Sequence, residues 1–383
     1  MRIRVTARRL LAAGVAVAAL LGATITAAPS TAMPTASAPA AASASAVTCA
    51  SSAPFVHAFT PTDPLSGTSD WLLPNISFSA ANADGVLGGV AEDGIGGFTP
   101  LRYDMRTQHL TVLGHYRFDP WEPGKSLHAA GVDAQGGVVF AVQARTNKAG
   151  SYIGVRYFGG HRLVLPHNTS WTDVEPTAVG AGGTIIGHVL VGKNPLYRAV
   201  KWAPTTFGPS YLPANVQEPV LDGAGGIAGS SQSGALIGTA QVIRRSGSVA
   251  TLIGPGGTQL NNSYPVAGGY GYVYGRADSA SDPRHVFRWS PEQQSGTRIE
   301  ATAISSIAFP AAAGPSGMVA GFIEFGAGQL AGPMALVRLG HYAKRLPTVF
   351  HEQYDQDDPV VFAPDGALIY TGADGLPRRF RCH

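Results

Sequence analysis

Five residue-proline pairs recur along the sequence, and three of them place a carboxylate before the proline. The pairs are Glu175-Pro176, Glu218-Pro219, Tyr264-Pro265, Phe309-Pro310 and Asp358-Pro359. Each proline precedes, by six or seven residues, a glycine of the repeat described below. Carboxylates that converge act as general acid and base, or they bind a cation or a hydroxyl-rich ligand. A proline at the first residue of a strand also loses no ladder hydrogen bond, so these pairs equally suit plain strand starts.

Polar and aromatic residues concentrate in the loops that lead to these pairs, at 115–122, 167–175 and 351–358. In a chain with only 13% charged residues, this concentration marks one face of the protein. Tryptophan rings there offer flat apolar surfaces for a sugar or a peptide side chain. We therefore select seven ligand-binding candidates: Glu175, Glu218, Asp358, Tyr264, Trp121, Trp171 and His351. Ordinary solvated loop residues are the alternative.

No complete catalytic or cofactor motif is present in the sequence. His351-Glu352 begins like a zinc-protease helix, but Asp355 stands where the second histidine belongs. Asp355, Asp357 and Asp358 offer the hard oxygen ligands that calcium prefers, without EF-hand spacing. We assign no catalytic residue and expect no cofactor, with calcium at this aspartate group as the alternative.

A glycine repeat organises the chain. Each copy has a glycine, a β-forming residue two places later and usually a second glycine at the fourth place. The copies begin at Gly85, Gly137, Gly183, Gly225, Gly271, Gly317 and Gly366, and successive copies lie 42 to 52 residues apart. A basic residue flanked by apolar or aromatic ones follows each start, as in Val155-Arg156-Tyr157 and Val200-Lys201-Trp202. The two features keep the same period, which indicates a structural repeat.

The segments of each copy are short, rich in β-branched and aromatic residues, and bounded by turn residues, so they predict strands. Four strands per copy predict an all-β fold, a propeller of about seven four-stranded antiparallel blades. A β-solenoid is the alternative, but its repeats are usually shorter. The inner strand of a blade lines the central channel, so the residue before each proline is expected near the channel mouth.

The last copy stops at Cys382-His383, before its outer strand. We expect an N-terminal strand to complete that blade and close the ring, from either 54–60 or 71–74. The two cysteines, Cys49 and Cys382, lie at the two ends of the expected domain. In an exported protein this placement predicts a disulfide.

The glycine copies, His57-Ala58-Phe59 and the run His285-Val286-Phe287-Arg288-Trp289 resemble the secreted HAF-repeat proteins. The resemblance covers about residues 54 to 382 and implies the propeller-like repeat. Most copies here lack the histidine of that repeat, and the asparagine before its glycine is replaced. The resemblance implies no particular activity.

The N-terminus predicts export. Residues 1–28 have arginines before an apolar run and small residues after it, which is the pattern of a signal peptide. An uncleaved membrane anchor is the alternative, and the Arg8-Arg9 pair leaves both the general secretory and the twin-arginine route open. Residues 29–48 are rich in Ala, Ser, Pro and Thr and predict a flexible spacer. Residues 49–383 then form the repeat domain.

The charge balance and the predicted export signal together define the expected function. Four of the 27 basic residues lie in the signal, which leaves 23 basic and 24 acidic residues in the rest of the chain. Because this balance gives no excess of positive charge, no nucleic-acid partner is expected. We expect a secreted, monomeric, non-enzymatic binding module that leaves the membrane after cleavage and binds an extracellular glycan or protein. The alternative is an extracellular polysaccharide-active hydrolase or lyase that uses the carboxylates at the channel mouth.

Overall fold

The structure is a computed structural model, and its described residues from Thr48 onward belong to one compact unit. The described ranges are 48–57, 75–92, 97–117, 127–144, 151–192, 196–213, 216–231, 238–244, 246–279, 282–299, 307–323, 334–338, 344–345 and 360–382. The predicted signal peptide and nearly all of the predicted spacer lie outside these ranges. Within them, no helix has the length and apolar character that crossing a bilayer requires.

Six antiparallel sheets are each built from strands consecutive in the chain. The first three contain β2 (Asn75–Ala81), β3 (Val86–Glu92), β4 (Gly97–Asp104) and β5 (His109–Val112); β7 (Leu127–Val132), β8 (Val138–Ala144), β9 (Ser151–Phe158) and β10 (His161–Val164); and β11 (Trp171–Val179), β12 (Ile185–Val191), β13 (Leu196–Trp202) and β14 (Pro209–Tyr211). A short β6 (Tyr116–Arg117) also pairs with β4.

The other three sheets repeat this order. They contain β15 (Gln217–Leu221), β16 (Ile227–Ser230), β17 (Ala240–Ile243) and β18 (Val249–Thr251); β19 (Asn261–Gly269), β20 (Tyr272–Ser279), β21 (Asp282–Trp289) and β22 (Gly296–Arg298); and β23 (Ile307–Ala313), β24 (Met318–Ile323), β25 (Met334–Arg338) and β26 (Lys344–Arg345). Two short 3-10 helices, η1 (Pro255–Gly257) and η2 (Pro315–Gly317), lie between strands.

A composite sheet joins the two ends of the repeat domain. It has the order β1 (Cys49–Ser51), β29 (Pro377–Cys382), β28 (Leu368–Thr371) and β27 (Val361–Phe362). The register places Cys49 opposite Cys382, and a disulfide joins the two residues as predicted. The pairing partner begins earlier than either segment expected from the sequence, because β1 starts at Cys49 and backbone bonds from Ser52 and Phe55 continue along β29. Residues 71–74 lie outside the described ranges.

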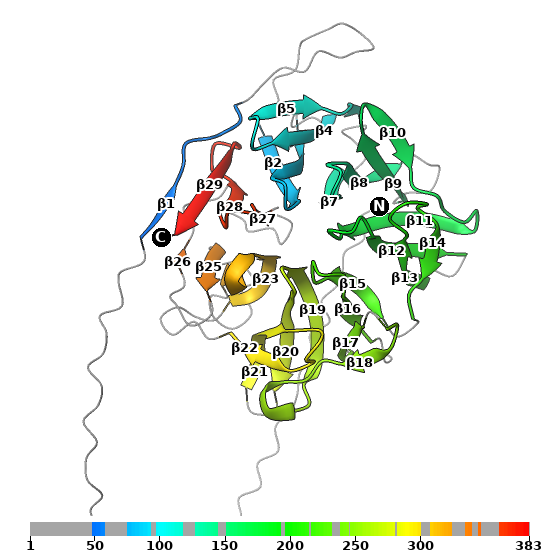
Figure 1. The fold of residues 1–383 in the computed structure, drawn as a ribbon, viewed down its shortest axis with the longest axis vertical. Helices are drawn as coiled ribbons and strands as arrows, with labels where there is room; N and C mark the ends of the chain where they lie inside the picture. Colours follow the sequence, from blue (N-terminus) through cyan, green and yellow to red (C-terminus); the bar gives the residue numbers. More distant parts are fainter. Residues whose placement is uncertain are drawn as a thin grey trace, which may run out of the picture. The chain divides into compact units, whose positions relative to one another are not determined.

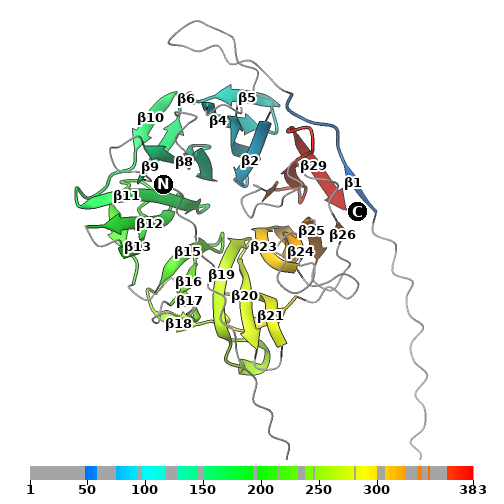
Figure 2. The ribbon, with the colours of Figure 1, turned by 180° about the vertical axis from the view of Figure 1, so that it is seen from behind.

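The sheets have the arrangement of a β-propeller. Their first strands β2, β7, β11, β15, β19, β23 and β27 contact one another in this order, and β27 also contacts β2. Figures 1 and 2 show these strands toward the middle and the fourth strands outside. The predicted all-β propeller of four-stranded antiparallel blades is therefore correct. The described residues form six blades of consecutive strands rather than the seven expected. That the composite sheet acts as a further blade and closes the ring stays a prediction.

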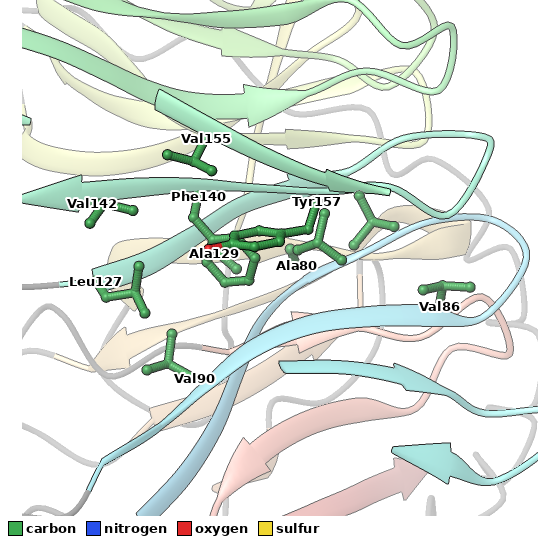
Figure 3. Close-up of a cluster of buried hydrophobic side chains, with 11 residues drawn as sticks. Ala80, Val86, Val90, Leu127, Ala129, Phe140, Val142, Val155 and Tyr157 are labelled. Atoms are coloured by element: carbon green, nitrogen blue, oxygen red, sulfur yellow. The ribbon is translucent and has the colours of Figure 1, made fainter. Parts of the chain in front are cut away.

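The cores lie between neighbouring sheets. Figure 3 shows one cluster, in which Ala80 and Val90 of the first sheet pack against Phe140 and Tyr157 of the second. Tryptophans of the repeat also join consecutive blades by hydrogen bonds. Trp202 Nε1 donates to the Pro166 carbonyl at 2.9 Å, and Trp289 Nε1 donates to the Ile253 carbonyl at 3.1 Å. In each bond, the residue whose carbonyl accepts lies 36 residues before the tryptophan in the sequence.

The two glycines of a copy have different physical roles, as the copy at 183–187 illustrates. Gly183 has φ +81° in the turn between the first two strands, a conformation that L side chains rarely adopt. Gly187 lies flat against the inner strand, where an added Cβ would overlap the Glu175 carbonyl oxygen and come within 2.8 Å of Pro176 Cα. Gly275 has the same relation to Tyr264 and Pro265. The second glycine, which has no side chain, therefore sets how closely the inner strand approaches the second strand.

Four of the five X-Pro pairs lie inside first strands, not before them as the sequence suggested, and the fifth, Asp358-Pro359, lies outside the described residues. Pro176 lies in β11 and Pro265 in β19, and a register shift follows each proline. The first strand is paired on one side only, so a proline there leaves no ladder bond unmade, and the shift is typical of a β-bulge. The prolines therefore mark an irregularity in the innermost strand.

Candidate functional site

A histidine and a carboxylate face each other on the two inner strands of the third sheet. Glu175 on β11 and His188 on β12 are register partners, and His188 Nε2 lies 2.7 Å from Glu175 Oε2. Both side chains are partly buried, with about a quarter or less of their surface exposed. Pro176 and Gly187 form the next register pair, and their close approach fixes the backbone beside Glu175 and His188. The pair is therefore held by the repeat scaffold itself.

A second histidine reaches the same carboxylate from the neighbouring sheet. His128 lies on β7, and its Nε2 is 3.8 Å from Glu175 Oε1. The ring of Tyr152 on β9 lies edge-on to His128, with the ring centroids 6.0 Å apart. Glu175 thus stands between two imidazoles supplied by two blades.

Asp173 connects the same two blades through the backbone. Its Oδ1 accepts a hydrogen bond of 2.6 Å from the Tyr152 amide. The side chain of Asp173 is only 4% exposed. Tyr197 of β13, whose ring is edge-on to His188 at 5.4 Å, is 50% exposed. A solvent-accessible aromatic ring therefore borders a partly buried group of ionisable side chains.

The charges within this group are coupled. Burial raises the pKa of Glu175, but the hydrogen bond and charge of His188 outweigh it, so the pKa lies below its usual value. Burial lowers the pKa of His188, but Glu175, Asp173 and Glu218 outweigh it and hold the pKa above its usual value. Near neutral pH, Glu175 is ionised and His188 carries a larger share of its proton than a free imidazole.

The pKa of Asp173 is shifted in the opposite direction from that of Glu175. Burial of its carboxylate, assisted by the charge of Glu175, raises the pKa of Asp173 above its usual value. The two carboxylates lie two residues apart on one strand but have environments that separate their pKa values. A separation of this kind is found at many ligand-binding and catalytic sites.

Two of the seven ligand-binding candidates meet in this group. Glu175 is at its centre, and Glu218 on β15 acts on the charge of His188. Glu218 also has φ +46°, an uncommon conformation for a residue other than glycine. Tyr264 occupies the equivalent place on β19 of another sheet.

Of the four remaining candidates, the structure describes only Trp171. Trp171 is buried in the core of the third sheet, where its Nε1 donates to the Tyr211 hydroxyl at 2.6 Å, so its ring is not an open platform. Five other predicted residues lie outside the described ranges: Trp121, His351, Asp355, Asp357 and Asp358, of which the three aspartates form the group predicted for calcium. Among the residues that are described, no three His, Cys, Asp or Glu side chains are arranged to hold a metal ion.

Sequence reasoning missed His188, His128, Asp173 and Tyr197. For His188 a signal existed, because the residue after the second glycine of a copy is the register partner of the residue before the proline. Tyr264 and Arg276 show the same relation around Gly275. For the other three residues, no spacing in the sequence indicates how the strands that carry them pack together.

Comparisons with known proteins support the fold. An oligogalacturonate lyase from Vibrio parahaemolyticus superposes with a TM-score of 0.54 at 11% identity, covering 88% of this chain and 96% of that one. A prolyl endopeptidase structure superposes with a TM-score of 0.52 at 12% identity; the match covers 80% of this chain and half the length of that one. No family model matches the sequence. No curated protein matches it either. At these identities the similarity extends to the propeller fold alone.

Proposed function

We propose that this protein is an exported, non-enzymatic binding module that recognises a hydroxyl-rich ligand, a carbohydrate, beside the Glu175–His188 pair. The observation that carries this proposal is the pair itself, held at 2.7 Å between two inner strands and bordered by the half-exposed ring of Tyr197. Carboxylate and imidazole groups in fixed positions accept and donate hydrogen bonds to sugar hydroxyls, and an aromatic ring packs against the apolar face of a sugar.

The ionisation of the pair favours binding over catalysis. A general base works best with a pKa near the working pH and a free lone pair. His188 Nε2 is engaged by Glu175, and the carboxylates around it favour the protonated ring. Glu175, with its lowered pKa, is a poor proton donor at neutral pH. The two groups stabilise each other in the charged state, which suits recognition.

A glycan panel tests the proposal. The domain from residue 49 onward is screened against neutral, acidic and amino-substituted oligosaccharides, and hits are measured by titration calorimetry. We expect Glu175→Gln and His188→Gln to weaken binding about tenfold or more, the loss of a hydrogen bond to a charged group. Glu292→Gln, an exposed carboxylate before β22, is the matched control and should leave affinity unchanged. Binding to no glycan, or affinity unchanged in both site variants, contradicts the proposal.

One observation favours the second candidate, a polysaccharide-active hydrolase or lyase. Asp173 has a raised pKa beside the ionised Glu175, and enzymes that cleave glycosidic bonds pair carboxyl groups in this way. The solved lyase structure with a similar fold adds a reason to test it. An assay for new reducing ends and for unsaturated products on the bound glycan decides between the two, and turnover that Asp173→Asn abolishes would favour the enzyme.

A further inference from the structure

A buried hydrogen-bond acceptor without a partner lies beside the proposed site. Gln143 is near the end of β8, only 9% of its surface is exposed, and within the described part of the chain its Oε1 accepts no hydrogen bond. An unsatisfied buried acceptor costs about 1–3 kcal/mol. Folded proteins leave few such atoms, and a ligand that supplies the donor is one explanation.

The register of the second sheet places Gln143 on the side of this sheet that faces the site. Gln143 is the register partner of Tyr152, so both side chains lie on one face of the sheet. The Tyr152 amide donates to Asp173, and the Tyr152 ring contacts His128. Val139, four residues before Gln143 and on the same face, packs in a core cluster with Val174 of β11. The free acceptor therefore faces the strand that carries the carboxylates.

Among the described residues of this neighbourhood, three carboxylates stand beside two imidazoles. Asp173, Glu175 and Glu218 all act on His188, which compensates for only part of their charge. His128 adds an imidazole at 3.8 Å from Glu175. A hydroxyl group brings one donor and no charge, whereas an ammonium group brings three donors and a positive charge. An ammonium group therefore complements the excess of carboxylates among these side chains, because it supplies both donors and a positive charge.

We propose that the site selects a carbohydrate carrying a free amino group, whose ammonium donates to Gln143 Oε1 and the Asp173 carboxylate. This proposal rests on the proposed function and specifies its ligand class. The half-exposed Tyr197 ring then packs against the sugar or contacts the cation through its face. Masking the amino group by acetylation removes the charge and two of the three donors, so it should remove the preference.

Three oligosaccharides of equal length and linkage test the ligand class. They are the tetramers of β-1,4-linked glucosamine, N-acetylglucosamine and glucose, each titrated into the wild-type domain at mildly acidic pH, where the amino group is protonated. We expect the glucosamine tetramer to bind at least about tenfold more tightly than the other two, equivalent to about 1.4 kcal/mol. Equal affinity for all three overturns the amino-group proposal and leaves the carbohydrate proposal standing. No binding of any tetramer contradicts both.

Variants test the residues. Gln143→Met keeps the size of the side chain and removes the acceptor, and Asp173→Asn removes the charge. Each should abolish the preference for glucosamine, so that the glucosamine and glucose tetramers bind the same variant with equal affinity. Gln135→Met, in the exposed turn before β8, is the matched control. A preference that persists in both site variants overturns the proposal. If a variant fails to fold, the comparison of the three tetramers on the wild type still decides.

Discussion

The sheet of β11–β14 and the sheet of β19–β22 have the same scaffold but carry different side chains at one place. In both, a proline lies within the inner strand, a second glycine packs against that strand, and a tryptophan bonds to a carbonyl 36 residues earlier. The register partners are Glu175 and His188 in one sheet and Tyr264 and Arg276 in the other. The repeat thus fixes backbone positions, and the pair of residues at those positions gives a blade its chemistry.

Substituting the second glycine tests whether the scaffold is equivalent in the two sheets. Gly187→Ala and Gly275→Ala each force a Cβ into the carbonyl oxygen and α-carbon of the inner strand. We expect each to lower the free energy of unfolding by about 3 kcal/mol, measured by urea denaturation. Gly187→Ala should also abolish glycan binding because it displaces Glu175, whereas Gly275→Ala should retain binding at temperatures where it is folded. A loss of binding in both variants would mean that the two sheets are not independent.

Removing the tryptophan hydrogen bonds is expected to have a smaller effect. Trp202→Phe and Trp289→Phe keep an aromatic ring but leave the Pro166 and Ile253 carbonyls without their donors. Each should cost about 2 kcal/mol, from the lost hydrogen bond and the space left by the smaller ring. Thermal unfolding of the two variants should give similar shifts. A large difference between them would show that the joint between consecutive blades is not a repeated element.

The pH dependence of stability should distinguish the two sheets. The lowered pKa of Glu175 stabilises the fold above its unfolded value of 4.5, and this contribution disappears as pH falls through the folded value. The raised pKa of His188 stabilises the fold below its unfolded value of 6.5, and this contribution disappears as pH rises through the folded value. The pair therefore contributes most between pH 4.5 and 6.5.

Within that window, Glu175→Gln should lower the free energy of unfolding by about 1 kcal/mol, with a smaller difference on both sides of it. Tyr264→Phe, at the equivalent place of the other sheet, should give a difference that does not vary with pH over this range. Denaturant titrations at a series of pH values provide the measurement. A constant deficit for Glu175→Gln would show that the carboxylate acts through packing alone.

The smallest effect has the opposite sign. Asp173→Asn makes β11 resemble β19, which has Asn262 two residues before its proline pair. Burial raises the pKa of Asp173, so its ionised form opposes folding at neutral pH. The asparagine retains an oxygen for the Tyr152 amide and carries no charge. We therefore expect a slightly higher melting temperature at neutral pH and no gain at strongly acidic pH.

The sequence predicted the propeller because glycine spacing and β-forming residues are local properties that recur in each copy. It predicted the Cys49–Cys382 bridge from the placement of the cysteines, but it placed the pairing strand too late, since Cys49–Ser51 has no strong β pattern. It selected Glu175 and Glu218 through the adjacent prolines, and the structure places both beside His188; that they bind a ligand stays a prediction. It could not identify His128, because the contact with Glu175 arises only when two consecutive blades pack together.

The disulfide has a mechanical consequence. Cys49 and Cys382 lie 333 residues apart in sequence and are joined directly. A pulling force applied to the chain before Cys49 and after Cys382 therefore passes through a single covalent bond and never through the sheets between them. The hydrogen bonds of the blades therefore carry none of the tension. The repeat domain should keep its fold under a load that would separate β1 from β29 in the reduced protein.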